Sequence, residues 1–108
     1  PLAMSLLVAT ALPAVAGAAE PPTPQQAFKD NCVECHGEDA KGVKDAGLDL
    51  TTSAFVAGMT DAQFTEFLKV GRAAVDRASK TGQLMPAFDY LGDDELRAVI
   101  AYVRKRTR

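Results

Sequence analysis

With 108 residues and a net charge of −2 at pH 7, the chain has room for one small domain. Apolar residues make up 47% and charged residues 24%, an ordinary composition for a soluble globular protein. This balance, with no basic stretch interleaved with aromatic side chains, argues against nucleic-acid binding. Because a domain of this size has a small core, we expect a disulfide, a metal or a cofactor to stabilise it.

Residues 1–19 differ in character from the rest, because they carry no charge and the first charged residue is Glu20. The segment 14–18 contains two overlapping small-x-small patterns of the kind that a signal peptidase recognises. We therefore interpret residues 1–19 as a signal peptide that exports the protein to the periplasm. The alternative is an N-terminal membrane anchor facing the periplasm, although the run is near the lower length limit for crossing a bilayer.

The linker at residues 20–26 turns into the first predicted helix, for which Thr23 is the N-cap and Gln26 completes a capping box. This helix is expected to continue through both cysteines. Phe28, Cys32 and Cys35 then lie on one helical face, at positions i, i+4 and i+7.

Two further helices are predicted after the loop at residues 37–53. One begins at Thr60 with a second capping box and ends at Gly71, and the last begins near Asp93 after a long loop at residues 72–92. No alternating strand pattern is present, so the predicted class is all-α, with three main helices and long loops. The buried stripe of the last helix is predicted to comprise Leu96, Val99, Ile100 and Val103.

The segment CVECHG contains the only two cysteines and the only histidine of the chain: Cys32, Cys35 and His36. A thioredoxin-type dithiol would need a strand-helix-strand framework, which the pattern does not offer. A structural zinc site generally takes four protein ligands, and only three cysteine and histidine residues exist. A disulfide between the cysteines would close a very small loop, stabilise little and leave the histidine without a role.

C-x-x-C-H is the signature of c-type haem attachment. Two thiols on one helical face add to the two vinyl groups of the porphyrin, and the following imidazole turns over the ring plane to bind iron. We therefore predict that Cys32 and Cys35 hold the haem covalently and that His36 is the proximal iron ligand.

The second axial ligand cannot be another histidine of this chain, and a methionine thioether is the usual alternative. Met4 lies in the predicted signal segment, and Met59 is better explained as a hydrophobic staple before the second helix. Met85 lies in the long loop, where Pro86 stiffens the backbone. We predict Met85 as the distal ligand.

The CVECHG helix, the MPAF loop and the final LGDDELRAVIAYVR helix, in that order, resemble a small bacterial class I cytochrome c. The resemblance covers residues 24–106 of a predicted domain at residues 24–108, and it implies the cytochrome c fold around one covalent haem c. It also implies that the first and last helices pack through an aromatic contact, for which Phe28 and Tyr102 occupy the matching positions. Many members have a proline whose carbonyl accepts a hydrogen bond from the ligand histidine. This chain has none after the motif, so we expect that carbonyl near Ala46 or Gly47.

The resemblance implies a one-electron carrier that is not an enzyme and that works between exported or membrane-bound redox proteins, as a monomer if soluble. Two alternatives are a haem-bearing relay subunit of a larger dehydrogenase or oxidase and an open-iron peroxidase or gas sensor. A basic group beside the predicted ligand loop would suit an acidic partner, although a solvated helix end and loop, diluted by Asp76, is the simpler explanation. The group comprises Lys69, Arg72, Arg77 and Lys80. Apolar side chains expected to bury the haem are Phe55, Phe67, Leu68, Leu84 and Phe88.

Overall fold

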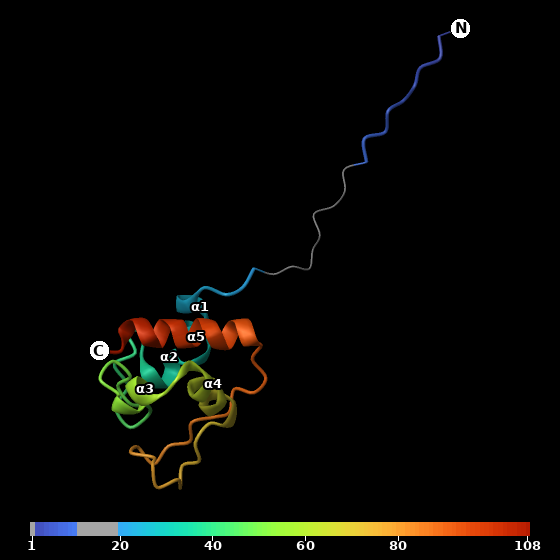
Figure 1. Cartoon of the computed structure of the whole chain (residues 1–108). Coiled ribbons are helices and arrows are strands. Elements are labelled where there is room, and N and C mark those ends of the chain that lie inside the picture. Colours follow the sequence, from blue (N-terminus) through green and yellow to red (C-terminus); the bar gives the residue numbers. More distant parts are fainter. Residues whose placement is uncertain (1, 11–19) are drawn as a thin grey trace.

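The computed structural model describes residues 2–10 and 20–108, and that part of the chain forms five helices joined by turns (Figure 1). The described residues contain no β-strand and only two isolated β-bridges, in agreement with the predicted all-α class. The helices are α1 (Pro24–Asn31), α2 (Val33–His36), α3 (Ala54–Gly58), α4 (Asp61–Val70) and α5 (Asp93–Arg106).

The predicted signal peptide or anchor falls partly on residues 1 and 11–19, which lie outside the described residues. Residues 2–10 form neither helix nor strand and are exposed. Within the described ranges, no helix has the length and apolar character needed to cross a membrane.

The predicted start of α4 is confirmed in detail, because Thr60 and Gln63 form a complete capping box. The Thr60 hydroxyl accepts from the Gln63 N–H at 3.1 Å, and the Gln63 side chain accepts from the Thr60 N–H at 2.9 Å. At α1 only half of the predicted box is present. Thr23 accepts from the Gln26 N–H at 3.2 Å, but the Gln26 amide donates to Asp30 at 2.6 Å instead of returning to Thr23.

The prediction of one continuous helix through both cysteines is wrong at Cys32. Its backbone, at φ −124° and ψ −23°, departs from helical values and separates α1 from α2. The chain nevertheless keeps its direction, since Cys32 N–H donates to Phe28 O at 2.8 Å and His36 N–H donates to Cys32 O at 2.9 Å. The short helix α3, capped by the Ser53 hydroxyl, was not predicted.

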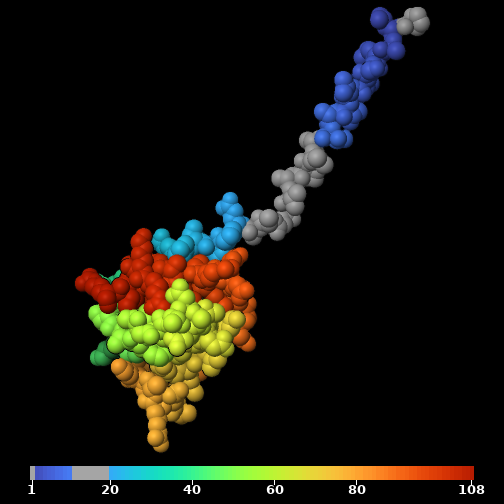
Figure 2. Space-filling view, in the orientation of Figure 1, coloured from blue at the N-terminus to red at the C-terminus, as the bar shows by residue number. Residues whose placement is uncertain are grey.

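The core forms where α5 crosses α1, and α5 also contacts α4 (Figure 1). The rings of Phe28 and Tyr102 stack with centroids 4.3 Å apart, which confirms the predicted aromatic contact between the first and last helices. Figure 2 shows α5 along one side of the body, while the segment near residue 80 projects on the opposite side. All four residues of the predicted α5 stripe are buried, namely Leu96, Val99, Ile100 and Val103.

Truncating Phe28 to alanine is expected to lower the free energy of unfolding by about 3–5 kcal/mol, because a fully buried aromatic ring leaves a cavity that the helices cannot refill. Denaturant unfolding of the purified chain measures this change. Tyr90→Ala is the matched control, since the Tyr90 side chain is exposed and its removal should have little effect. Equal losses in the two variants would contradict a core centred on the α1–α5 crossing.

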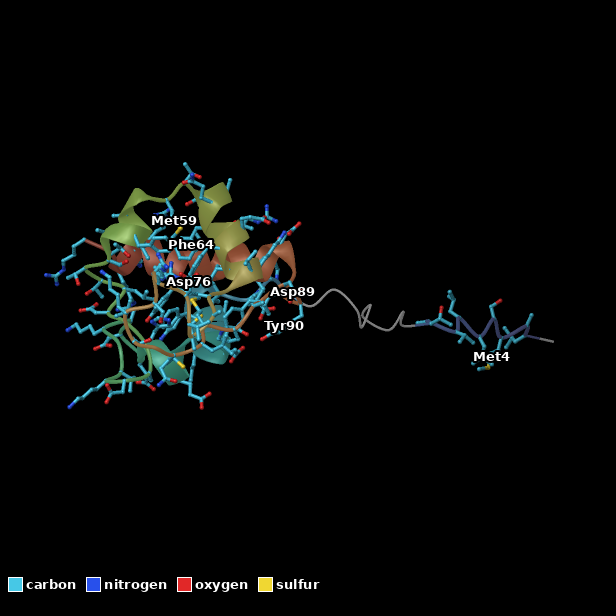
Figure 3. The ribbon with its side chains drawn as sticks, turned by 90° about the horizontal axis from the view of Figure 1, so that it is seen from below. Met4, Met59, Phe64, Asp76, Asp89 and Tyr90 are labelled. Atoms are coloured by element: carbon cyan, nitrogen blue, oxygen red, sulfur yellow. The ribbon has the colours of Figure 1, made fainter. Side chains whose placement is uncertain are left out.

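Arg104 of α5 ties α3 and the start of α4 to the last helix. Its guanidinium donates to the carbonyls of Val56 at 2.6 Å and Met59 at 2.5 Å, and it pairs with Asp61 at 3.1 Å. Met59 lies beside Phe64 at the start of α4 (Figure 3), where both pack in or against the core. This arrangement places the α3–α4 connection against one wall of the cavity described below.

Candidate functional site

His36 ends α2, and its ring is oriented by the loop that follows. The Nδ1 atom lies 2.8 Å from the carbonyl oxygen of Leu48. Because a carbonyl can only accept, Nδ1 carries the proton and Nε2 keeps a free lone pair, the form in which an imidazole binds a metal. We expected this carbonyl near Ala46 or Gly47; the structure places it at Leu48, one residue further along the chain.

Gly47 explains why the accepting carbonyl is displaced to the next residue. A Cβ at this position would lie 2.7 Å from the carbonyl carbon of Cys35 and 3.1 Å from Nδ1 of His36. The backbone of Gly47 therefore packs directly against α2, which a side chain would prevent. This close approach brings the Leu48 carbonyl within reach of the ring.

The loop after Leu48 is ordered by its own side chains. Asp49 accepts from the hydroxyl of Thr51 at 2.6 Å and from its N–H at 2.8 Å. These two hydrogen bonds hold the pKa of Asp49 below its usual value, and the bond from the Thr51 hydroxyl has the larger effect.

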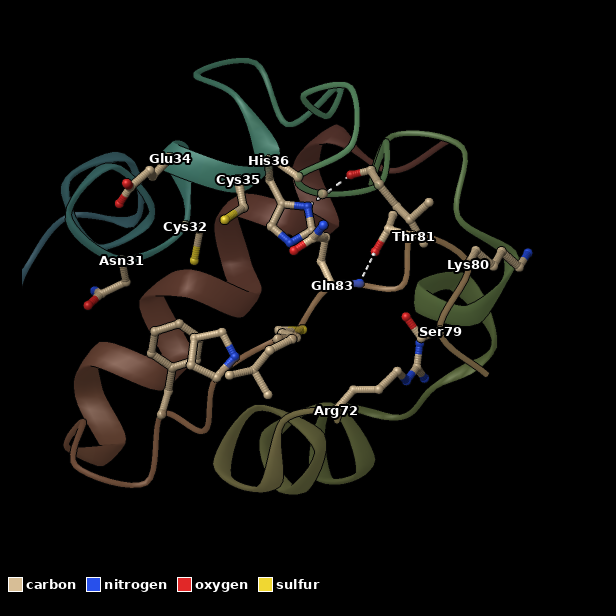
Figure 4. A pocket seen from close by; sticks show the side chains of 17 residues that line it. Asn31, Cys32, Glu34, Cys35, His36, Arg72, Ser79, Lys80, Thr81 and Gln83 are labelled. Atoms are coloured by element: carbon tan, nitrogen blue, oxygen red, sulfur yellow. Dashed lines mark hydrogen bonds between the residues drawn. The ribbon is translucent and has the colours of Figure 1, made fainter. Parts of the chain in front are cut away.

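Cys32 immediately precedes α2 and Cys35 lies within it, and the two cysteines differ in exposure. Cys32 is half-buried and Cys35 is exposed, and both are free thiols. Burial, with a smaller contribution from neighbouring Cys35, raises the pKa of the Cys32 thiol to about 12. Figure 4 shows both sulfur atoms and the His36 ring along one wall of the same pocket, with Arg72 across from them.

Met85 approaches the same pocket from the long loop, held by a two-way backbone pairing with Arg72. Each of these residues donates its N–H to the carbonyl of the other at 2.9 Å. Gly71 makes this pairing possible, because a Cβ there would lie 2.8 Å from the carbonyl carbon of Pro86. The Met85 side chain is partly buried against the core.

Two adjoining cavities meet at these residues, with volumes of about 200 and 630 Å³. The larger lies within the range of about 300–1,000 Å³ that is typical of cofactor sites. The larger cavity is lined mostly by apolar side chains, among them the predicted burying residues Phe55, Phe67 and Leu68. The smaller cavity has a mixed lining, in which Leu84 and Phe88 lie beside polar and charged side chains. The residues that line both cavities are Cys32, His36, Leu48, Arg72, Lys80 and Met85.

The donors around the cavities fit a haem. One imidazole nitrogen with a free lone pair and one thioether sulfur are an established axial ligand pair for haem iron, and two thiols lie beside the histidine. The apolar walls suit the porphyrin face, and the cationic Arg72 suits its carboxylates.

Arg72 has a different position from the one expected of a docking residue. Its guanidinium lies over the rings of Phe55 and Phe67, 4.8 and 4.9 Å from their centroids, and is only partly exposed. The sequence predicted this arginine on the outer surface, because charge alone does not reveal that its guanidinium stacks on two aromatic rings.

A search with family sequence profiles decides the classification. The profile described as Cytochrome c matches residues 24–107. The chain belongs to the cytochrome c family. The predicted fold class is thereby confirmed, with five helices in the described residues where three main ones were expected.

Among curated proteins, similar sequences are found in oxidase subunits. The Cbb3-type cytochrome c oxidase subunit CcoP of Rhodobacter capsulatus is 35% identical over 88 residues, which is 73% of this chain and 27% of that protein. The Cbb3-type cytochrome c oxidase subunit FixP of Bradyrhizobium sp. is 35% identical over 78 residues, or 70% of this chain and 24% of that protein. The chain thus spans about a quarter of the length of these relatives. The prediction of an electron-transfer protein rather than an enzyme is confirmed at the level of the family.

Proposed function

We propose that this cytochrome c domain binds one haem c covalently through Cys32 and Cys35 and holds its iron between His36 and Met85. The observation that carries the proposal is the hydrogen bond from His36 Nδ1 to Leu48, which leaves Nε2 free beside cavities that Met85 also lines. When bound, the haem supplies one-electron transfer by cycling between ferric and ferrous iron.

In this function the protein chain holds the side chains of His36 and Met85 in place and excludes water from the site. The Leu48 carbonyl fixes the orientation and tautomer of His36, and the pairing with Arg72 fixes the backbone of Met85. The apolar wall formed by Phe67, Leu68 and Phe88 lowers the local dielectric, which favours the less charged ferrous state. Fixed ligands also keep structural change on electron transfer small.

Replacing both Cys32 and Cys35 by alanine is expected to abolish covalent haem attachment, while each single variant retains one thioether. Intact mass of the chain after acid-acetone extraction, following expression with a haem-attachment system, measures this directly. The wild-type chain should gain the mass of one haem. A wild-type chain that loses its haem to the solvent would contradict the proposal. The alternative, a disulfide between Cys32 and Cys35, would then be favoured.

The setting that the relatives favour is a relay domain of a membrane-bound oxidase rather than a freely diffusing carrier. The similar proteins are named as subunits of cbb3-type oxidases, and the chain spans about a quarter of their length. Under this proposal the domain faces the periplasm and residues 1–19 are an anchor; a cleaved signal peptide would suit the soluble, monomeric carrier. The exposed cations Arg77 and Lys80, with Lys69, would then meet an acidic partner surface.

Cell fractionation separates the two settings. A tagged full chain expressed in its own host should remain with the membranes and, after detergent extraction, co-purify with oxygen-reducing activity. Recovery in the soluble periplasmic fraction, with no associated oxidase subunit, would support the free carrier instead.

A further inference from the structure

The C-terminal half of α5 and the two residues after it hold both ends of the loop that orients His36. This loop, residues 37–53, is called the histidine loop below. At its start, the Tyr102 hydroxyl donates to the carbonyl of Glu38 at 2.6 Å. At its end, the Thr107 hydroxyl donates to the carbonyl of Leu50 at 3.0 Å, and the Arg108 N–H donates to that of Thr51 at 2.8 Å.

Only one residue separates the carbonyl that Thr107 holds from the carbonyl that His36 uses. Leu50 is further fixed by its own N–H, which donates to the carbonyl of Ala40 at 2.8 Å. Leu48 therefore lies between Gly47, which packs against α2, and Leu50, which is fixed by hydrogen bonds at both its N–H and its carbonyl. A shift of Leu50 therefore changes the direction in which the Leu48 carbonyl points.

The Thr107 hydroxyl has two carbonyls within reach, Leu50 at 3.0 Å and Val103 at 2.8 Å, but only one proton. The Val103 carbonyl already accepts the backbone N–H of Thr107 at 2.9 Å. The Leu50 carbonyl has otherwise only a long contact of 3.5 Å from the Ser53 N–H. The Thr107 proton is therefore better donated to the Leu50 carbonyl, which would otherwise lack a good hydrogen-bond donor.

We propose that Thr107 is a positioning residue for His36, acting through Leu50 and the Leu48 carbonyl. The inference rests on the proposed function, in which His36 binds iron. A hydrogen bond donated by Nδ1 makes the imidazole a more basic ligand, and a more basic ligand stabilises ferric iron. Thr107 thus tunes the reduction potential of the haem from a helix end that does not line either cavity.

Thr107→Val keeps the shape of the side chain and removes its hydroxyl. The ferrous-to-ferric ratio at a fixed ambient potential is expected to rise about threefold, equivalent to about 28 mV at 59 mV per tenfold. The His36 Nδ1–H proton, followed by NMR in the reduced protein, is expected to exchange about two- to tenfold faster with solvent. Thr107→Ser retains the hydroxyl and should restore both values.

Thr65→Val is the matched control. The Thr65 hydroxyl donates to the carbonyl one helical turn earlier, that of Asp61 at 2.8 Å, on α4 and away from the histidine loop. This variant should leave the potential and the Nδ1–H exchange rate at their wild-type values, even if the free energy of unfolding changes.

The inference is overturned if Thr107→Val lowers stability while the potential and the exchange rate match those of Thr65→Val, because Thr107 is then only a helix cap. Failure of the proposed function has a different signature. In that case the wild-type protein itself lacks the spectrum of a histidine- and methionine-ligated haem, whatever residue occupies position 107.

Discussion

Replacing Met85 by leucine should remove the far-red sulfur-to-iron absorption band of the oxidised protein and let carbon monoxide bind the reduced iron. The reason is that leucine fills the space of methionine but has no sulfur to donate to iron. Leucine and methionine exchange in cores at a cost of less than about 1.5 kcal/mol, so the fold should persist. Absorption spectra of both oxidation states, and titration of the reduced protein with carbon monoxide, measure the result. The reduction potential should also fall, since a thioether ligand raises it.

Met59→Leu is a closely matched control, because Met59 is also a partly buried methionine that lines the larger cavity. It should retain the far-red band and resist carbon monoxide as the wild type does. If the band survived in Met85→Leu and vanished in Met59→Leu, the ligand would be Met59. Ready binding of carbon monoxide by the wild type would instead favour the open-iron enzyme or sensor.

Gly71→Ala should lower the free energy of unfolding by about 3 kcal/mol. Gly71 has φ +72° and ψ −160°, a backbone region that is essentially restricted to glycine. A methyl group there would also lie 2.9 Å from the Ala87 nitrogen and would push the loop that carries Met85 away from α4. We therefore expect partial loss of the far-red band together with the loss of stability, measured by denaturant unfolding and absorption spectroscopy.

Two other glycines separate backbone strain from crowding at Gly71. Gly82 has φ +68° and open space around its Cβ position, so Gly82→Ala should cost only about 1–2 kcal/mol. Gly58, at the end of α3, has neither constraint, and Gly58→Ala should leave stability nearly unchanged or slightly higher. Equal effects of the three substitutions would contradict the tight packing of the Met85 loop against α4.

Features set by neighbouring residues could be predicted from the sequence. The caps at Thr23 and Thr60 depend on hydroxyls that reach only three residues ahead, and the buried side of α5 follows from helical periodicity. The contact between Phe28 and Tyr102 was predicted differently, from resemblance to a family, because the two residues are 74 positions apart in the sequence and no local pattern relates them.

Features that depend on the folded loops could not be predicted. The acceptor for His36 is Leu48 rather than a neighbour because Gly47 abuts α2, a contact that exists only once the loop has closed. The stacking of Arg72 on two rings requires α3, which is too short for a periodic pattern to indicate. The ligand role of Met85 stays a prediction, since proximity to the cavity does not by itself demonstrate a bond to iron.

The most direct test of the account is the absorption spectrum of the wild-type protein, purified after co-expression with a haem-attachment system and recorded in both oxidation states. We predict a reduced spectrum of c type that survives acid-acetone extraction, with a far-red band in the oxidised protein. Covalent haem without that band would contradict ligation by Met85. The absence of covalent haem would contradict the central claim that Cys32, Cys35 and His36 form a haem-attachment site.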